Sequence, residues 1–241
     1  MQGCADAHPA VVPHPSPNCG SRREGARPDM IVLHYTGMQS LAAALERLCD
    51  PESEVSAHYL ISERGEVLHL VEEEMRAWHA GAGQWGDITD VNSRSIGIEL
   101  VNTGAHPFPE PQMAVLERIL REIMGRWDIL PERIIAHSDM APMRKSDPGP
   151  RFDWRRLAMR GLSIWPQMRA TVGAGDLAAR FVGDARAFGY ALVDENMLDY
   201  VLKAFRMRFR PEVTGPLDAV DSAMIGNLAQ RFPVDRRRAS A

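Results

Sequence analysis

The chain has 241 residues, of which 45% are apolar and 25% are charged, and this is the composition of an ordinary soluble protein. Its 28 basic and 32 acidic residues give a net charge of −4, which argues against nucleic acid or an anionic membrane surface as the main partner. Three cysteines without a CxxC pair indicate neither a disulfide framework nor a cysteine zinc site. No apolar run reaches the length of a transmembrane helix.

The first residues, MQGCADAHPA, lack a charged segment followed by an apolar one, so no signal peptide is predicted and a cytoplasmic location is favoured. The alternative is a periplasmic protein, or an outer-membrane lipoprotein anchored through Cys4, if an upstream signal is missing from the sequence. Residues 1–29 are rich in Pro, Gly, Ser and His, and we expect an extended N-terminal arm there rather than a core element.

Residues 30–165 alternate between strand-like and helix-like patterns. Short apolar, β-branched runs predict strands, and apolar residues at i, i+3, i+4 and i+7 predict helices, with Ser40 as one N-cap. The expected strands are 30–35, a hairpin formed by 56–62 and 66–71, 95–101 and 133–137. The expected helices are 40–49, 111–127 and 153–162. The pattern predicts an α/β fold with a central mixed sheet flanked by helices.

The composition changes after residue 165. Residues 166–175 are expected to form a linker, 176–233 a small domain of three helices, and 234–241 a basic tail. Asp194 is the expected cap of the clearest helical pattern. That pattern consists of Leu198, Val201, Leu202, Phe205 and Phe209.

Three residues suggest a metal centre. His34 ends the first predicted strand and His137 ends the last, and the carboxyl ends of neighbouring parallel strands share one crevice. Asp147, in a loop restricted by prolines, can supply a third ligand. Two histidines and one carboxylate form a known catalytic zinc set that leaves one position for water.

Two further residues could carry chemistry beside such a metal. Glu99 alternates with the isoleucines of its strand, so it faces away from them and can act as a general base. Lys145 lies two residues from Asp147 and can therefore reach the same site to stabilise an oxyanion. Taken alone, His34 could equally be a hydrogen-bonded core histidine, Glu99 an edge charge and Lys145 a surface lysine. The residues by themselves leave these readings open.

Five segments in chain order resemble the signature blocks of the type-2 N-acetylmuramoyl-L-alanine amidases. The resemblance covers about residues 30–165 and implies a mixed sheet with helices packed on it. It implies one zinc ion bound by His34, His137 and Asp147, with Glu99 as general base and Lys145 as the residue that polarises the carbonyl. The segments are IVLHYTG (31–37), VSAHYLIS (55–62), AWHAG (77–81), NSRSIGIELVNTG (92–104) and AHSDMAPMRKSDPGPRFDW (136–154).

The resemblance implies hydrolysis of the amide between N-acetylmuramic acid, in its ordinary or anhydro form, and L-Ala of the peptidoglycan stem peptide. Its partners are then peptidoglycan or muropeptide fragments, and a monomer is expected. Trp78, His79 and Asn92 are candidates to line the substrate groove. The stretch LKAFRMRFRP (202–211) resembles the core helix of a peptidoglycan-binding module, although an ordinary three-helix appendage explains it almost as well.

Two other functions compete with this one. Relatives of the fold bind peptidoglycan without catalysis after losing a metal ligand, whereas all the candidate ligands are present here. A zinc hydrolase acting on another amide or on a lipid-linked sugar is the third reading, since a fold alone does not determine a substrate.

Overall fold

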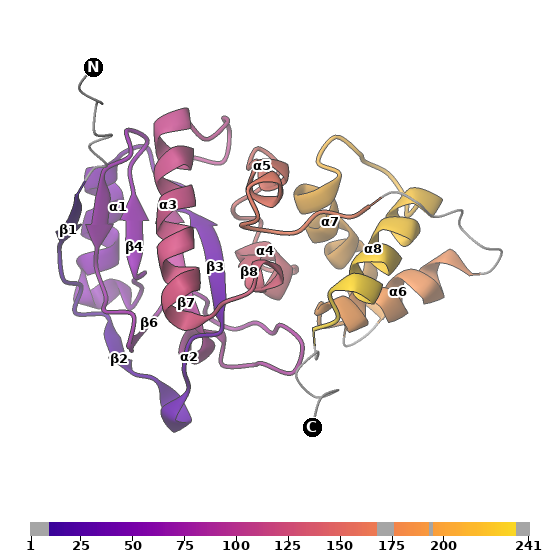
Figure 1. The fold of residues 1–241 in the computed structure, drawn as a ribbon, viewed down its shortest axis with the longest axis horizontal. Coiled ribbons are helices and arrows are strands. Elements are labelled where there is room, and N and C mark those ends of the chain that lie inside the picture. The colour runs from indigo at the N-terminus through magenta and orange to yellow at the C-terminus, as the bar shows by residue number, and fades with distance from the viewer. Residues whose placement is uncertain (1–9, 168–175, 193–194, 235–241) are drawn as a thin grey trace, which may run out of the picture.

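A mixed β-sheet with helices on its faces forms the centre of the molecule, and three C-terminal helices pack beside it (Figure 1). The structure is a computed structural model that describes residues 10–167, 176–192 and 195–234. Within those residues, no helix has the length and the apolar character needed to cross a membrane. The predicted fold class, a mixed sheet flanked by helices with a small helical region after it, is confirmed.

The strands form two sheets. They are β1 (Val11–Pro13), β2 (Cys19–Ser21), β3 (Met30–Tyr35), β4 (Tyr59–Ile61), β5 (Val67–His69), β6 (Met75–Ala77), β7 (Ser95–Leu100) and β8 (Ile134–Ala136). The large sheet has the order β1-β5-β4-β7-β3-β8, and β2 and β6 form a separate antiparallel pair. Strands β4, β7, β3 and β8 run parallel, while β5 returns antiparallel to β4 as the predicted hairpin.

Eight α-helices and four 3₁₀ turns connect and cover the strands of the described chain. The α-helices are α1 (Leu41–Cys49), α2 (Val91–Arg94), α3 (Glu110–Trp127), α4 (His137–Met140), α5 (Trp154–Met159), α6 (Leu177–Phe188), α7 (Leu198–Phe209) and α8 (Ala219–Arg231). The 3₁₀ turns are η1 (Arg23–Gly25), η2 (Pro51–Ser53), η3 (Pro131–Arg133) and η4 (Glu195–Met197).

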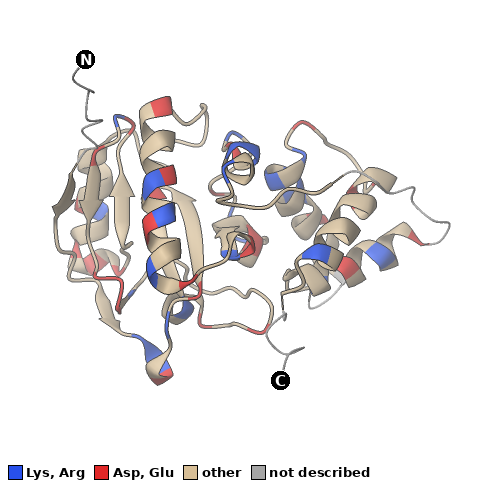
Figure 2. Cartoon of the chain, viewed as in Figure 1, with Lys and Arg blue, Asp and Glu red and all other residues tan. Residues whose placement is uncertain are grey.

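Strand β3 is buried on both faces, as its uninterrupted apolar sequence predicts for a central parallel strand. Because successive side chains alternate, Met30 and Val32 pack towards the C-terminal helices, while Ile31 and Leu33 pack in the cluster that contains α3. Helix α3 packs its apolar side in the cluster that contains Ile31 and Leu33, and most of its charged residues, coloured in Figure 2, are not buried, Glu117 being the exception. This is the amphipathic arrangement that its sequence period predicts.

The prediction of an extended arm for residues 1–29 did not include the two short strands that the structure describes there. Strand β1 pairs with β5 at the edge of the large sheet, and β2 pairs with β6. Asn18 is buried and donates hydrogen bonds to the carbonyls of Asp50 and Val55. Three-residue strands among prolines and glycines give no periodic signal, and an edge strand tolerates proline because one side of it needs no partner.

The C-terminal helices α6, α7 and α8, together with the described segments that join them, are called the helical unit below, and they share one hydrophobic cluster with the sheet. Trp85, from a loop before β7, contacts the rings of Phe188 and Tyr190, with ring centroids 5.5 and 5.2 Å apart. Of the five residues in the predicted helical pattern, Leu198 is partly buried and the other four are buried, namely Val201, Leu202, Phe205 and Phe209. The predicted domain boundaries stay a prediction, because residues 168–175 of the linker, Asp194 and residues 235–241 of the tail lie outside the described residues.

Candidate metal centre and active site

The candidate site lies where β3, β7 and β8 end. His34 of β3 stands directly opposite Glu99 of β7 in the register of the two parallel strands. His137 follows β8 immediately, as the first residue of α4, and Asp147 reaches the same place from the loop after that helix. The crevice at the carboxyl ends of parallel strands, which the sequence predicted, is therefore present.

Three donor atoms converge in this crevice. His34 Nδ1 lies 2.9 Å from His137 Nδ1 and 3.0 Å from Asp147 Oδ2, and the last two atoms are 2.9 Å apart. All three side chains are buried, and their donor atoms could together hold a metal ion. Ligands bound to zinc at about 2.0–2.1 Å lie about 3.3 Å from each other in a tetrahedral site, so the observed spacing is close to that requirement.

A chain of hydrogen bonds through Ser95 and His79 determines which ring nitrogen of His34 carries a proton. Ser95 donates its only hydroxyl hydrogen to the carbonyl of Val91 at 2.5 Å, so its oxygen must accept from His79 Nε2 at 3.1 Å. His79 Nδ1 then has no proton and accepts from His34 Nε2 at 3.0 Å. His34 Nδ1 is left with a free lone pair that points to the site.

The same argument applies to His137, whose Nε2 lies 2.9 Å from the carbonyl oxygen of Ala80. A carbonyl can only accept, so Nε2 carries a proton, and in the neutral ring Nδ1 is the acceptor. Burial and the neighbouring His137 lower the pKa of His34 to about 4, which keeps its imidazole neutral. The Nδ1 atoms of His34 and His137 and the Asp147 carboxylate therefore converge on one point. Imidazole nitrogens and a carboxylate oxygen arranged in this way suit a metal cation such as zinc.

Glu99 is half-buried, and its Oε2 has no hydrogen-bond partner among the described residues. Burial, and then the negative charge of Asp147, raise the pKa of Glu99 to about 8, while Lys145 acts in the opposite direction. Its side chain faces away from Ile96 and Ile98, as the alternation predicted. A carboxyl group held in this way is a candidate for proton transfer.

A pocket of about 390 Å³ opens over these groups. Glu99, Lys145 and Asp147 line it together, and Trp78 forms part of its wall. Further lining residues come from α1 and from the segment after β3, among them Thr36, Met38, Arg47 and Leu48. The structure thus brings together the predicted ligands, the predicted base and the predicted lysine.

Two of the predicted groove residues have a different place. Asn92 was expected to line the groove, but it is buried behind it, where its Oδ1 accepts from the backbone nitrogens of His79 and Ala80. His79 reaches the pocket wall, yet both of its ring nitrogens are occupied by His34 and Ser95. Sequence reasoning missed this supporting role because the contact joins residues far apart in the chain. One signal was present in Gly97, where a Cβ would lie 2.4 Å from the His79 ring.

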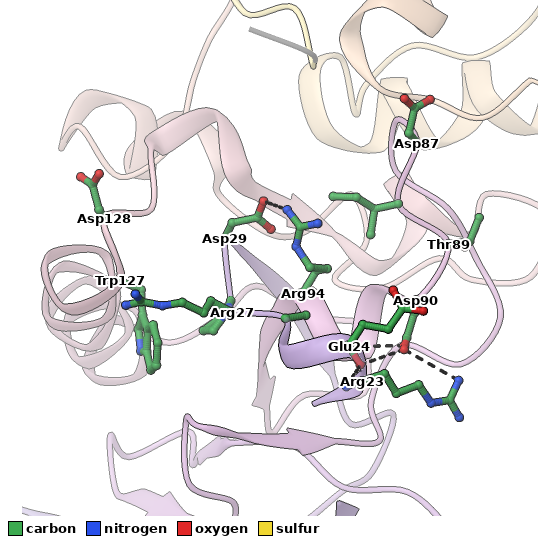
Figure 3. Close-up of a pocket in the computed structure, with 14 residues that line it drawn as sticks. Arg23, Glu24, Arg27, Asp29, Asp87, Thr89, Asp90, Arg94, Trp127 and Asp128 are labelled. Carbon is green, nitrogen blue, oxygen red and sulfur yellow. Dashed lines mark hydrogen bonds and ion pairs between the residues drawn. The ribbon is translucent and has the colours of Figure 1, made fainter. Parts of the chain in front are cut away.

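A larger cavity, of about 820 Å³, lies at the amino ends of the parallel strands, before β3 and β7 begin. It contains none of the predicted site residues. Figure 3 shows Asp29 beside Arg94 and Asp90 beside Arg23, each joined by an ion pair. Arg94 forms an ion pair with Asp29, and the guanidinium of Arg27 lies 5.5 Å from the centre of the Trp127 ring. The size of this cavity therefore does not mark it as the catalytic site.

Comparison with known proteins identifies the family. The model of the Amidase_2 family, described as N-acetylmuramoyl-L-alanine amidase, matches residues 24–150. The N-acetylmuramoyl-L-alanine amidase AmiD of Escherichia coli is 32% identical over 98% of this chain and 95% of its own length. The 1,6-anhydro-N-acetylmuramyl-L-alanine amidase AmpD of Enterobacter cloacae is 34% identical, but the match covers 59% of this chain and 86% of that relative.

Solved structures agree with this result. The complex of E. coli AmiD with the substrate anhydro-N-acetylmuramic acid-L-Ala-D-γ-Glu-L-Lys has a TM-score of 0.77 and 33% identity, covering 87% of this chain and 92% of that one. AmpDh3 from Pseudomonas aeruginosa in complex with anhydromuramic pentapeptide has a TM-score of 0.78 and 31% identity, covering 97% and 100%. The predicted family and enzyme class are confirmed, and the chain belongs to the type-2 N-acetylmuramoyl-L-alanine amidase family.

Proposed function

We propose that the chain hydrolyses the amide between the lactyl carboxyl group of anhydro-N-acetylmuramic acid and L-Ala of the peptidoglycan stem peptide, in cell-wall turnover or recycling. AmiD and AmpDh3, which match nearly the whole chain, have each been solved with an anhydromuramic peptide bound. The muropeptide would lie in the pocket above Glu99, with Trp78 in its wall. Location and oligomeric state stay predictions, as does peptidoglycan binding by residues 176–233.

One observation carries the proposal: the convergence of the Nδ1 atoms of His34 and His137 with the carboxylate of Asp147. Nitrogen and carboxylate oxygen are ligands that suit zinc, and both imidazoles are held from behind by hydrogen bonds, as zinc-binding histidines are. The residues therefore fit the metal that the family implies. When bound, zinc supplies Lewis-acid activation of a water molecule and of the scissile carbonyl.

Glu99 is the proposed general base. Its carboxylate takes a proton from the attacking water as the new carbon–oxygen bond forms, and returns that proton to the amine of L-Ala as the carbon–nitrogen bond breaks. The raised pKa of about 8 belongs to the protein without metal. A nearby cation stabilises the charged carboxylate and lowers that pKa, so Glu99 can accept a proton at neutral pH.

Lys145 is the proposed oxyanion stabiliser. It lines the same pocket as Glu99, and its backbone nitrogen donates to the carbonyl of Ala141 at 2.9 Å, which fixes the loop that carries it. An ammonium group positioned before the reaction begins stabilises the negative charge that develops on the carbonyl oxygen. The three charged groups Glu99, Lys145 and Asp147 thus have separate tasks within one pocket.

The test is a product assay on purified full-length protein with anhydro-muropeptides and with intact peptidoglycan, with the metal content measured on the same sample. We expect release of free stem peptide, its loss after thorough chelation, and its recovery with zinc. Unchanged activity in protein shown to contain no metal would contradict the metal centre. Release of a product other than the intact stem peptide would contradict the assigned bond.

A further inference from the structure

The helical unit contacts the turn that carries a proposed metal ligand. Helix α4 begins with His137, and the backbone nitrogen of its next residue, Ser138, donates to the carbonyl of Asp147 at 3.0 Å. This short turn therefore joins two of the three proposed ligands. Any group that fixes α4 fixes the distance between the donor atoms of His137 and Asp147.

Asp139, the third residue of α4, is completely buried and is the group that holds the turn. Its Oδ2 accepts from the backbone nitrogen of Ala136, the last residue of β8, at 2.9 Å. The helical unit supplies two further donors: Arg208 Nη1 to Oδ2 and the Tyr190 hydroxyl to Oδ1, each at 2.6 Å. Burial, and then the charge of Asp139, raise the pKa of Tyr190 well above its usual value, so the hydroxyl keeps its proton.

Arg208 contacts both sides of this turn. Besides Asp139, it donates to the carbonyl of Ile134 in β8 at 2.9 Å, and its guanidinium stacks over the Trp154 ring, 4.3 Å from the ring centre. The side chain of Arg208 is only 1% exposed and that of Asp139 is not exposed at all. Buried ion pairs are weak sources of stability but define one arrangement of the chain, because removing either partner leaves an uncompensated charge.

We infer that Arg208 and Tyr190 are positioning residues of the metal centre: through Asp139 they hold α4 so that His137 and Asp147 face His34. The helical unit is then part of the active-site scaffold, whatever it binds. The inference rests on the proposed metal centre.

Zinc affinity of the full-length protein, measured by competition with a chromophoric chelator, tests this inference. Tyr190→Phe removes a single hydroxyl donor and keeps the ring, while Arg208→Lys keeps the charge but loses the contact geometry. We expect each variant to bind zinc roughly tenfold more weakly, with a lower kcat and an unchanged KM, because groups behind metal ligands typically affect affinity by about 10–100-fold.

Arg206→Lys is the matched control. Arg206 lies on the same helix and is also buried, but its partners are Asp221 and the carbonyls of Gly215 and Pro216, all inside the helical unit. We expect this variant to lower the melting temperature without changing zinc affinity. An equal loss of affinity in Arg206→Lys would show a general effect of destabilisation and would overturn the inference.

The remaining outcomes separate the two proposals. Unchanged zinc affinity in both folded variants, with a wild-type protein that binds zinc, would overturn the positioning role alone. A wild-type protein that binds no zinc would overturn the metal centre and the positioning role with it. Circular dichroism before each titration confirms that Tyr190→Phe, the milder change, is folded.

Discussion

The two ends of the parallel strands in the central sheet use charged and polar groups in different ways. At the carboxyl ends of β3 and β8, the Nδ1 atoms of His34 and His137 converge on the carboxylate of Asp147. At the amino ends, just before β3 and β7, Asp29 forms an ion pair with Arg94. The first arrangement offers donor atoms to a cation, whereas the second pairs charges within the chain.

This difference supports the assignment of the proposed active site to the smaller pocket. The cavity at the amino ends of β3 and β7 has a volume of about 820 Å³, whereas the pocket over the candidate metal centre has about 390 Å³. Asp29 also lies 3.1 Å from Arg133, and Arg23 lies 3.7 Å from Asp90, so these charges have partners of opposite sign in the folded chain. A carboxyl group with a strongly raised pKa beside converging donor atoms, as at Glu99, indicates a site better than empty volume does.

The largest effect is expected at the proposed metal ligands themselves. Asp147→Ala removes one of three ligands and the only negative one, so we expect zinc binding to be lost and activity to fall by about three orders of magnitude or more. Metal analysis of the dialysed variant and the muropeptide assay check this. A variant that keeps one zinc ion and full turnover would exclude Asp147 as a ligand.

Glu99→Gln, at the carboxyl ends of the strands, should lower catalysis without lowering metal binding. The amide has the size of the carboxylate but cannot take a proton, so we expect kcat to fall by about 10²–10⁴-fold while zinc content stays that of the parent protein. Glu122→Gln, on the outer part of α3, is the control for a surface glutamate and should have parental kcat. Loss of zinc from folded Glu99→Gln would instead make Glu99 a ligand.

The smallest effect on catalysis is expected for a substitution at the amino ends of the strands, where Asp29 lies. Asp29→Asn removes a partly buried charge from Arg94 and Arg133, so we expect the free energy of unfolding to fall by about 1–3 kcal/mol, with kcat/KM unchanged. Denaturant unfolding and the muropeptide assay on the same preparation check both statements. A tenfold loss of kcat/KM at constant zinc content would show that the amino ends of the strands influence catalysis at the carboxyl ends. It would contradict the separation of the two sites.

Much of the sheet could be predicted from the sequence because its signals are local. The apolar run of β3, the helical period of α3 and the Ser40 cap of α1 each depend on neighbouring residues, and the structure has them where they were expected. The N-terminal strands were missed because three-residue strands have no period to detect. Their place is decided by the edges that β5 and β6 leave open.

The candidate site divides in the same way. The residues His34, His137 and Asp147 could be named from their types, from their positions at strand ends and from the family resemblance. The roles of His79 and Asn92 could not, because each depends on one hydrogen bond to a distant backbone or ring atom. The family resemblance of the segment that contains Trp78 and His79 suggested that both residues line the groove. Both do line the pocket, but His79 also forms a hydrogen bond with the proposed ligand His34, whereas Trp78 does not.

The sequence by itself therefore determined the class of fold, the donor atoms available for a metal and the carboxylate proposed as the base, since side-chain chemistry and local period depend on the order of residues. The tertiary structure decided which ring nitrogens face the proposed metal centre, because the carbonyls of Val91 and Ala80, far along the chain, accept hydrogen bonds from Ser95 and from the His137 ring. It also decided that Arg208 of the helical unit reaches Asp139 beside His137. Such contacts arise only when the packed sheet and helices bring distant segments together.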